Sequence, residues 1–495
     1  MEMQFQKTVV PYLQTLTHQM QTQEQTQQVR LSDAMPDVGK VVASWGQVLL
    51  RGKEWRSDSV CVTGGVKAWT LYVPEDGSQP RCVESWLPFQ MKWDMPEAQR
   101  DGTVIACSMP VTVEARMLSD RKLMVRANVP IMACAMVSAE AAIHTPADLP
   151  QDVQTLRNTY PMRLPVEAGE KAFEMEETVS LPSSEQPMET LLRYTLEPAL
   201  TESKLVADKL VLRGMARLHM LYMGTDGRLH SWGTELPFSQ YTQLDEQYEP
   251  GAEAKICFGV TALELEPGED VALMLKAGIT AQYVICDQKE VVVAQDMYSP
   301  NRSVKLTVEE LRLPAVLDEQ NRNVRVEVTP EKMPLQMVDA VFLPEVPAVS
   351  LEEDNVYTKL GGTIQLLGIN EEGELCCENC HWEDALSFPA GEQTDTHLCL
   401  HSMGIPQSTG NGMRTELKLD ALTTTLQPMV VVTGAELGET TEPDPNRPSL
   451  ILRRLGDESL WDIAKRTGST VDAIRKLNGL QQEPTNDQML LIPIV

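Results

Sequence analysis

One short stretch of the chain gathers side chains that bind transition metals. In Cys376-Cys377-Glu378-Asn379-Cys380-His381, two residues separate the thiols of Cys377 and Cys380, as in a zinc knuckle. Three more soft ligands alternate further along and share one face if the segment is a strand, and these are His397, Cys399 and His401. Against a zinc site, no second Cys-x-x-Cys occurs in the sequence. The alternative is a set of ordinary thiols in a surface turn, and on this interpretation we expect no metal and no other cofactor.

The C-terminal segment 449–495 holds the second candidate site. Its apolar spacing predicts the order strand, helix, helix, strand. The first helix buries Leu460, Ile463 and Ala464, which lie at i, i+3 and i+4. The second is expected to begin with a capping box from Ser469 to Asp472 and to end at Asn478-Gly479, before a closing strand at 489–492.

This segment resembles a LysM domain. The matching residues are Leu460, Trp461, Ile463, Ala464, Arg466, Ile474, Asn478, Leu480, Leu490, Ile492 and Pro493. The resemblance implies a shallow groove that binds N-acetylglucosamine-containing glycans such as peptidoglycan or a chitin-like glycan. The implied groove residues are Gly456, Asp457, Glu458, Ser459 and Leu460 on one side, and Asn478, Gly479 and Leu480 on the other.

Two features leave the ligand of this groove open. The Gly456-Asp457 pair stands one residue earlier than the Gly-Asp of the LysM pattern, and Trp461 is the only aromatic residue of the segment that can stack on a sugar. A protein ligand at the same groove is therefore the alternative to a glycan.

The sequence offers no set of residues for catalysis. It has seven histidines, no Gly-x-Ser-x-Gly elbow and no glycine-rich phosphate loop. Runs of acidic residues are typical of solvated faces at this composition. We therefore expect a protein that is not an enzyme.

The charge balance excludes classes of partner. The 495 residues include 42 Lys and Arg against 71 Asp and Glu, a net charge of −29, and segment 449–495 is neutral. A surface of that sign repels phosphate backbones and anionic lipid, so nucleic acid binding and membrane insertion are not expected.

The N-terminus and the cysteines point to the compartment. The first 28 residues lack a basic cluster and an apolar run of signal-peptide length, so we expect the protein to stay in the cytoplasm of the cell that makes it. Several cysteines stand singly in apolar runs, as reduced core cysteines do, and these are Cys61, Cys107, Cys134, Cys257 and Cys286.

The chain upstream of the C-terminal segment repeats itself at an offset of about 150 residues. The matches are Gly64 with Gly214, Leu71-Tyr72 with Leu221-Tyr222, Asp76-Gly77 with Asp226-Gly227, Leu87-Pro88-Phe89 with Leu236-Pro237-Phe238, Cys107 with Cys257, and 124–127 with 274–277. A shared offset over sixty residues indicates duplication. Alternating apolar residues and the Asp-Gly turns predict antiparallel β hairpins in each copy.

A third, diverged copy follows. Trp382 and Phe388 stand 150 residues after Trp232 and Phe238, and Glu372-Gly373 replaces the Asp-Gly turn. This alignment places the cysteine cluster in a hairpin turn four residues longer than that of the second copy. The expected organisation is an extended or weakly helical N-terminal arm at 1–28, β repeats at 29–145, 181–330 and 331–436, a linker at 146–180, a stiff acidic tether at 437–448 that holds the last module away, and that module at 449–495.

The glycine, Asp-Gly and Leu-Pro-Phe set resembles the SPOCS domain of endospore-forming bacteria. SPOCS repeats followed by a LysM domain resemble the SipL-type spore coat morphogenetic proteins. The resemblance implies a mainly β fold of repeated antiparallel domains followed by a small βααβ domain. It also implies a non-enzymatic scaffold in the mother cell, at the forespore surface, that bridges a SpoIVA-type ATPase of the basement layer to other coat proteins. The alternative is a peptidoglycan-binding protein anchored to cortex or cell wall through LysM.

Overall fold

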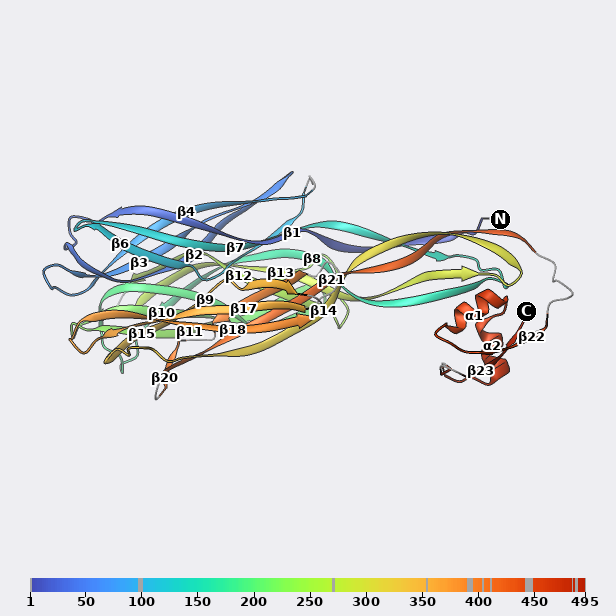
Figure 1. Ribbon diagram of the computed structural model, residues 1–495. Helices are drawn as coiled ribbons and strands as arrows, with labels where there is room; N and C mark the ends of the chain where they lie inside the picture. The colour runs from blue at the N-terminus through green and yellow to red at the C-terminus, as the bar shows by residue number, and fades with distance from the viewer. Residues whose placement is uncertain are drawn as a thin grey trace.

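The chain forms an elongated β structure with a small helical module at one end (Figure 1). This computed structural model describes residues 2–96, 101–268, 272–352, 355–389, 395–402, 405–409, 412–440, 448–482, 484–485 and 488–494. For 316–318, 351, 389, 395–402 and 422 it describes the backbone alone. The expectation of a mainly β chain that ends in a βααβ domain is confirmed.

Three copies of one strand arrangement make up the β part. Copy 1 contains β1 (Phe5–Arg30), β2 (Val38–Arg56), β3 (Ser59–Pro74), β4 (Arg81–Asp94), β5 (Thr103–Ser108), β6 (Thr112–Ser119) and β7 (Lys122–Pro146). Copy 2 contains β8 (Gln154–Val179), β9 (Met188–Val206), β10 (Lys209–Gly224), β11 (Leu229–Gln243), β12 (Glu253–Pro267) and β13 (Leu273–Tyr298). Copy 3 contains β14 (Arg302–Val328), β15 (Gln336–Pro344), β16 (Ala348–Glu352), β17 (Asn355–Ile369), β18 (Leu375–Pro389), β19 (Asp395–Ser402), β20 (Gln407–Thr409) and β21 (Gly412–Thr440).

In every copy the first strand pairs antiparallel with the last along nearly its whole length, and a separate three-stranded meander lies between them in sequence. The last strand also pairs with β5, β12 or β19 on its other side. In copy 3 the first meander strand is divided into β15 and β16, which pair with successive parts of β17.

Two segments that we expected to be an arm and a linker are long strands. β1 occupies most of 1–28, and β8 occupies most of 146–180. β14, which we placed in the second repeat, pairs with β21 of copy 3. The expected boundaries thus cut through paired strands. The polar composition of β1 misled the prediction, because most of its side chains are exposed or only half-buried.

The sequence motifs of copies 1 and 2 correspond to cross-strand pairs. Gly64 lies opposite Phe89, and Gly214 lies opposite Phe238. In each pair the phenyl ring covers the glycine, and a Cβ at Gly214 would come within 2.3 Å of that ring. The expected hairpin turns are also present, and their glycines have positive φ in all three copies, namely Gly77 (71°), Gly227 (72°) and Gly373 (81°).

The outer parts of the three long ribbons, β1·β7, β8·β13 and β14·β21, converge into a stalk (Figure 1). One apolar core inside the stalk takes side chains from all three copies, namely Ala141, Ile143, Met162, Leu164, Val291, Val293, Leu313, Ala315, Met429 and Val431. The backbone N–H of Met3 donates to the carbonyl of Ala435 at 2.9 Å, which joins the start of copy 1 to copy 3. The repeats therefore pack on one another rather than forming a string of separate domains.

Equivalent residues of the three copies meet inside the body. Ala43, Arg193 and Asp339 each follow a β-bulge and lie opposite an equivalent leucine, namely Leu71, Leu221 and Leu367. Nη2 of Arg193 donates to Oδ2 of Asp339 at 2.8 Å, and both side chains are only 1% exposed. Together with the three ribbons that share one stalk core, this contact between equivalent positions indicates a pseudo-threefold arrangement whose axis passes near the ion pair.

The C-terminal module contains β22 (Leu450–Arg454), α1 (Leu460–Thr467), α2 (Val471–Asn478) and β23 (Met489–Pro493). Ser459 caps α1 in a capping box with Asp462, and Gly468 ends that helix with a φ of 64°. α2 is capped by Thr470 rather than by Ser469, whose side chain is fully buried, so the predicted capping box was placed one residue early.

Candidate binding groove of the C-terminal module

The first wall of the predicted groove is largely a structural element. Leu460 is buried in the core of the module. Oδ2 of Asp462 accepts from the backbone N–H of Ser459 at 3.3 Å, and the Ser459 hydroxyl accepts from the backbone N–H of Asp462 at 3.1 Å. Ser459 and Leu460, both predicted as groove residues, therefore hold the start of α1 in place.

Glu458 joins two elements of the module. Its carboxylate accepts two hydrogen bonds of 2.6 Å from Arg466 and one of 2.8 Å from Arg453. The hydrogen bonds from Arg466 hold the pKa of the Glu458 carboxyl below its ordinary value. The carboxylate stays ionised near neutral pH and connects β22 to α1.

Asn478, on the second wall, is used in the same way. Its Nδ2 donates to the carbonyls of Ile474 at 2.8 Å and Leu491 at 2.6 Å, and its Oδ1 accepts from the backbone N–H of Leu491 at 2.8 Å. The side-chain amide thus acts as an extra strand residue that ties α2 to β23. Of the predicted groove residues, Asn478 is the one whose role in the fold is clearest.

The remaining residues of the predicted groove are exposed or half-buried. Gly456, Asp457 and Gly479 are exposed, and a Cβ at either glycine would meet no atom within 4 Å. Leu480 is half-buried, and the neighbouring Leu477 is 47% exposed. Leu460 and Leu480, one from each predicted wall, belong to the same apolar core, and the groove between the walls remains a prediction.

Trp461, the candidate for stacking on a sugar, contacts the end of β13. Its indole Nε1 donates to Oδ2 of Asp296 at 2.8 Å, and its ring meets that of Tyr298 edge-on at a centroid distance of 4.8 Å. Lys465, one turn further along α1, forms an ion pair with the same Asp296 carboxylate at 2.7 Å. Neither partner was predictable from local sequence patterns, because Asp296 and Tyr298 lie near the end of β13, far from the module in sequence.

Tyr298 joins the core of the module. It is 5% exposed, it packs among the buried side chains of α1, α2 and β23, and its hydroxyl donates to the carbonyl of Ser469 at 3.0 Å. Burial raises the pKa of the Tyr298 hydroxyl to about 12, so it stays protonated at neutral pH. The module is thus docked on the end of copy 2, which corrects the expectation that a tether holds it away from the repeats.

Comparison with protein families identifies two of these parts. The SipL, SPOCS domain model matches residues 187–266, which run from β9 to β12 of copy 2, and the LysM domain model matches residues 454–493. The chain combines a SPOCS domain with a LysM domain. This architecture is the one that the sequence analysis predicted, and it fits a sporulation protein with a module of the peptidoglycan-binding type. No curated protein and no solved structure matches the chain.

Both matched domains are binding domains without a catalytic role. Copies 1 and 3 share the strand pairing of the matched SPOCS domain. Within the described residues, no helix has the length and apolar character needed to cross a bilayer.

The cysteine cluster of copy 3 lies in a strand, which corrects the prediction of a long turn. The β10–β11 and β17–β18 hairpins have turns of equal length, because Met223 pairs with Leu229 and Ile369 with Leu375. β11 and β18 are also both 15 residues long, so copy 3 has no added residues here. Counted from the turn, Trp382 lies where copy 2 has Leu236, and it is not the structural equivalent of Trp232.

The two thiols of the Cys-x-x-Cys motif belong to different apolar clusters. Cys377 packs against the core centred on copy 2, whereas Cys380 is buried in the core of copy 3. Residues three apart in a strand face opposite sides, so the two sulfurs do not converge. The side chains of His397, Cys399 and His401 on β19 lie outside the described part of the structure, and among the described residues no three His, Cys, Asp or Glu side chains form a metal-binding group.

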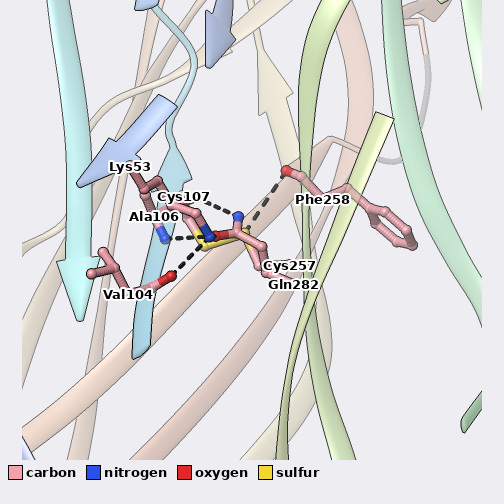
Figure 2. The surroundings of a disulfide bond; sticks show 7 residues. All are labelled: Lys53, Val104, Ala106, Cys107, Cys257, Phe258 and Gln282. Carbon is pink, nitrogen blue, oxygen red and sulfur yellow. Dashed lines mark hydrogen bonds between the residues drawn. A yellow bond between two sulfur atoms is a disulfide. The ribbon is translucent and has the colours of Figure 1, made fainter. Parts of the chain in front are cut away.

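Two cysteines that we expected to be reduced are joined. Cys107 of β5 and Cys257 of β12 form a disulfide with a Cα–Cα distance of 6.4 Å, so equivalent positions of copies 1 and 2 are linked (Figure 2). Cys61, Cys134 and Cys286 remain as buried thiols.

Proposed function

We propose that this protein is a non-enzymatic scaffold of spore coat or envelope assembly, in which the LysM groove binds a protein at the forespore surface. The observation that carries the proposal is that Asp296 and Tyr298 hold the LysM domain on the end of the stalk while the space at Gly456 and Gly479 stays open. A docked module presents its ligand site at a defined distance and orientation from the body. That arrangement suits a protein that connects two layers.

The chemistry of the groove favours a protein ligand over a glycan. Sugars are bound by aromatic faces and by polar groups that have hydrogen bonds to offer. Here the indole N–H of Trp461 is bonded to Asp296, the amide of Asn478 is satisfied by backbone groups, and Glu458 is held by two arginines. The exposed Leu477 beside the groove suits an apolar contact from a protein.

The resemblance to SipL-type proteins suggests the partners. The LysM groove would dock on a SpoIVA-type ATPase of the basement layer, on the mother-cell side of the forespore surface, and the three-copy body would bind other coat proteins. The strongly acidic composition fits basic partner surfaces.

The second candidate function is binding of peptidoglycan at cortex or cell wall. The open space at Gly456 and Gly479 favours it, because a polysaccharide chain needs a groove that no side chain closes.

A steric block of the groove tests both functions. Gly456→Trp fills the open space with little effect on folding, because the residue is exposed and lacks positive φ. Leu450→Trp is the matched control, since it adds the same side chain at an exposed position at the far end of β22. Binding of the full chain is measured by sedimentation with purified peptidoglycan and by interferometry with the purified basement-layer ATPase.

We expect binding to the ATPase that Gly456→Trp abolishes and Leu450→Trp preserves. Sedimentation with peptidoglycan that is lost only in Gly456→Trp, without ATPase binding, would establish the second function instead. Binding to neither probe, or ATPase binding that Gly456→Trp leaves unchanged, would reject the groove as the docking site.

A further inference from the structure

The disulfide between copies 1 and 2 lies apart from the predicted LysM groove and is a separate candidate site. Cys107 is buried, and Cys257 is half-buried and therefore the more accessible sulfur. The bond joins residues 150 positions apart, so it adds a cross-link between two copies that the backbone already connects at 147–153.

A side-chain clamp holds the two cysteine strands together beside the sulfurs. Gln282 lies directly opposite Cys257 in the β12·β13 ladder and is 2% exposed. Its Nε2 donates to the carbonyl of Ala106 at 2.6 Å, and its Oε1 accepts from the backbone N–H of Ala106 at 2.9 Å. Ala106 is the residue before Cys107, so the clamp fixes one cysteine relative to the other (Figure 2).

Lys53 extends this clamp. Its Nζ donates to Oε1 of Gln282 at 2.6 Å and to the carbonyl of Val104 at 2.8 Å, and it pairs with Glu170 at 2.6 Å. The contact thus joins β2 and β5 of copy 1 to β8 and β13 of copy 2. None of these hydrogen bonds involves a sulfur atom.

We propose that Cys107 and Cys257 form a covalent-modification site at which a small-molecule disulfide converts a preassembled thiol pair into a staple between copies 1 and 2. The folded protein positions both thiols through Gln282 before oxidation. The staple then fixes the relation of the two copies, and hence of the stalk that carries the LysM domain.

The chemistry balances as thiol–disulfide exchange. The Cys257 thiolate attacks one sulfur of the small-molecule disulfide, which forms a mixed disulfide and releases one small thiol after protonation. The Cys107 thiolate then attacks Sγ of Cys257 and releases the second small thiol. The protein loses two thiol protons and two electrons, and the small-molecule disulfide takes up both. Excess small thiol reverses the reaction.

The test measures the equilibrium between the two protein thiols and a glutathione redox buffer. The full chain is equilibrated at a series of ratios of reduced to oxidised glutathione, quenched by alkylation, and analysed by peptide mapping for the Cys107–Cys257 link. Gln282→Met removes the clamp and places there the residue found at the equivalent position of copy 1, Met132. Circular dichroism of each reduced variant establishes that it is folded.

A matched control comes from a second clamp between the same two copies. Gln47 of copy 1 donates to the carbonyl of Leu196 at 2.6 Å and accepts from its backbone N–H at 3.0 Å. Gln47→Met therefore removes two equivalent hydrogen bonds that do not adjoin the sulfurs.

We expect the reduced chain to stay folded. The effective concentration of the thiol pair should fall about tenfold in Gln282→Met, which removes three hydrogen bonds beside the thiols, that from Lys53 included. It should fall less than twofold in Gln47→Met, which removes two hydrogen bonds away from the thiols. A chain that unfolds on reduction, a link that does not form in any buffer, or equal effects of the two substitutions would overturn the proposal. The groove is unchanged in all variants, so ligand binding at LysM is tested separately.

Discussion

The buried ion pair at the pseudo-threefold axis provides a direct test of how the copies are held together. We predict that Asp339→Ala destabilises the body, because it leaves the Arg193 guanidinium buried without its counter-charge. Nε and Nη1 of Arg193 already lack hydrogen-bond partners among the described residues, so Asp339 is its main source of compensation.

The structure sets the size of this effect. Removal of one partner from a fully buried ion pair costs about 3–5 kcal/mol. Two contacts of Arg193 would remain, one to Nδ1 of His219 at 3.1 Å and one to the Trp45 ring at 4.5 Å from its centroid. These contacts place the expected loss at the lower end, about 3 kcal/mol.

Urea unfolding followed by tryptophan fluorescence measures the loss, and a double variant provides the control. Arg193→Ala with Asp339→Ala reproduces the residue that copy 1 has at this position, Ala43, and removes both charges. We expect the double variant to be more stable than Asp339→Ala alone, because no uncompensated charge is left. A loss below about 1 kcal/mol in the single variant, or strictly additive losses in the double variant, would refute the role assigned to the pair.

The pair also predicts a pH dependence. Burial alone would raise the pKa of the Asp339 carboxyl, but the charges of Arg193 and His219 lower it well below its usual range. A carboxyl with a lowered folded-state pKa contributes stability that is present above its unfolded pKa of about 4 and is lost as the pH falls toward the folded value. The stability difference between wild type and Asp339→Ala should therefore shrink as the pH falls below about 4.

Three further predictions concern the LysM domain and the staple. Asp296→Ala should release the domain from the stalk and change the fluorescence and proteolytic sensitivity around Trp461, whereas unchanged protection would show that apolar contacts suffice. Asn478→Ala should lower the stability of the LysM domain by about 2–3 kcal/mol, because the backbone N–H and carbonyl of Leu491 lose their partners, and the melting of that domain measures it. Reduction of the disulfide should lower the free energy of unfolding by up to about 5 kcal/mol, since it closes a loop of about 150 residues, and an unchanged urea midpoint would contradict this.

Local sequence patterns predicted the parts of the fold that are determined locally. The turns at Gly77 and Gly227 require positive φ, and an Asp-Gly pair in the sequence is typical of such turns. The two LysM helices followed from their apolar spacing and caps. The 150-residue offset identified the duplication because the glycine and phenylalanine of each motif form one cross-strand contact and are retained together.

The features that the sequence analysis missed depend on contacts between distant segments. β1 gives little apolar alternation because much of its ribbon is exposed, so pairing with β7 rather than burial defines it. The alignment of Trp382 with Trp232 ignored that a turn fixes the register of the strands that follow it. Cys107 and Cys257 were recognised as equivalent residues, but their contact depends on how the copies pack. The docking of Trp461 on Asp296 depends in the same way on the position of the stalk.

Because the three copies belong to one chain, they can carry different residues at the pseudo-threefold axis. In a trimer of identical chains, the same side chain would meet itself three times at the position of Ala43, Arg193 and Asp339, and a charge there would be repelled by its equivalents. Once the copies are covalently joined, each can diverge, and an arginine in copy 2 can pair with an aspartate in copy 3. The same freedom applies at the stalk, where only copy 2 carries the tyrosine and aspartate that dock the LysM domain. The LysM domain thus docks on one of three similar ribbons, so a pseudo-symmetric body carries this domain at a single defined position.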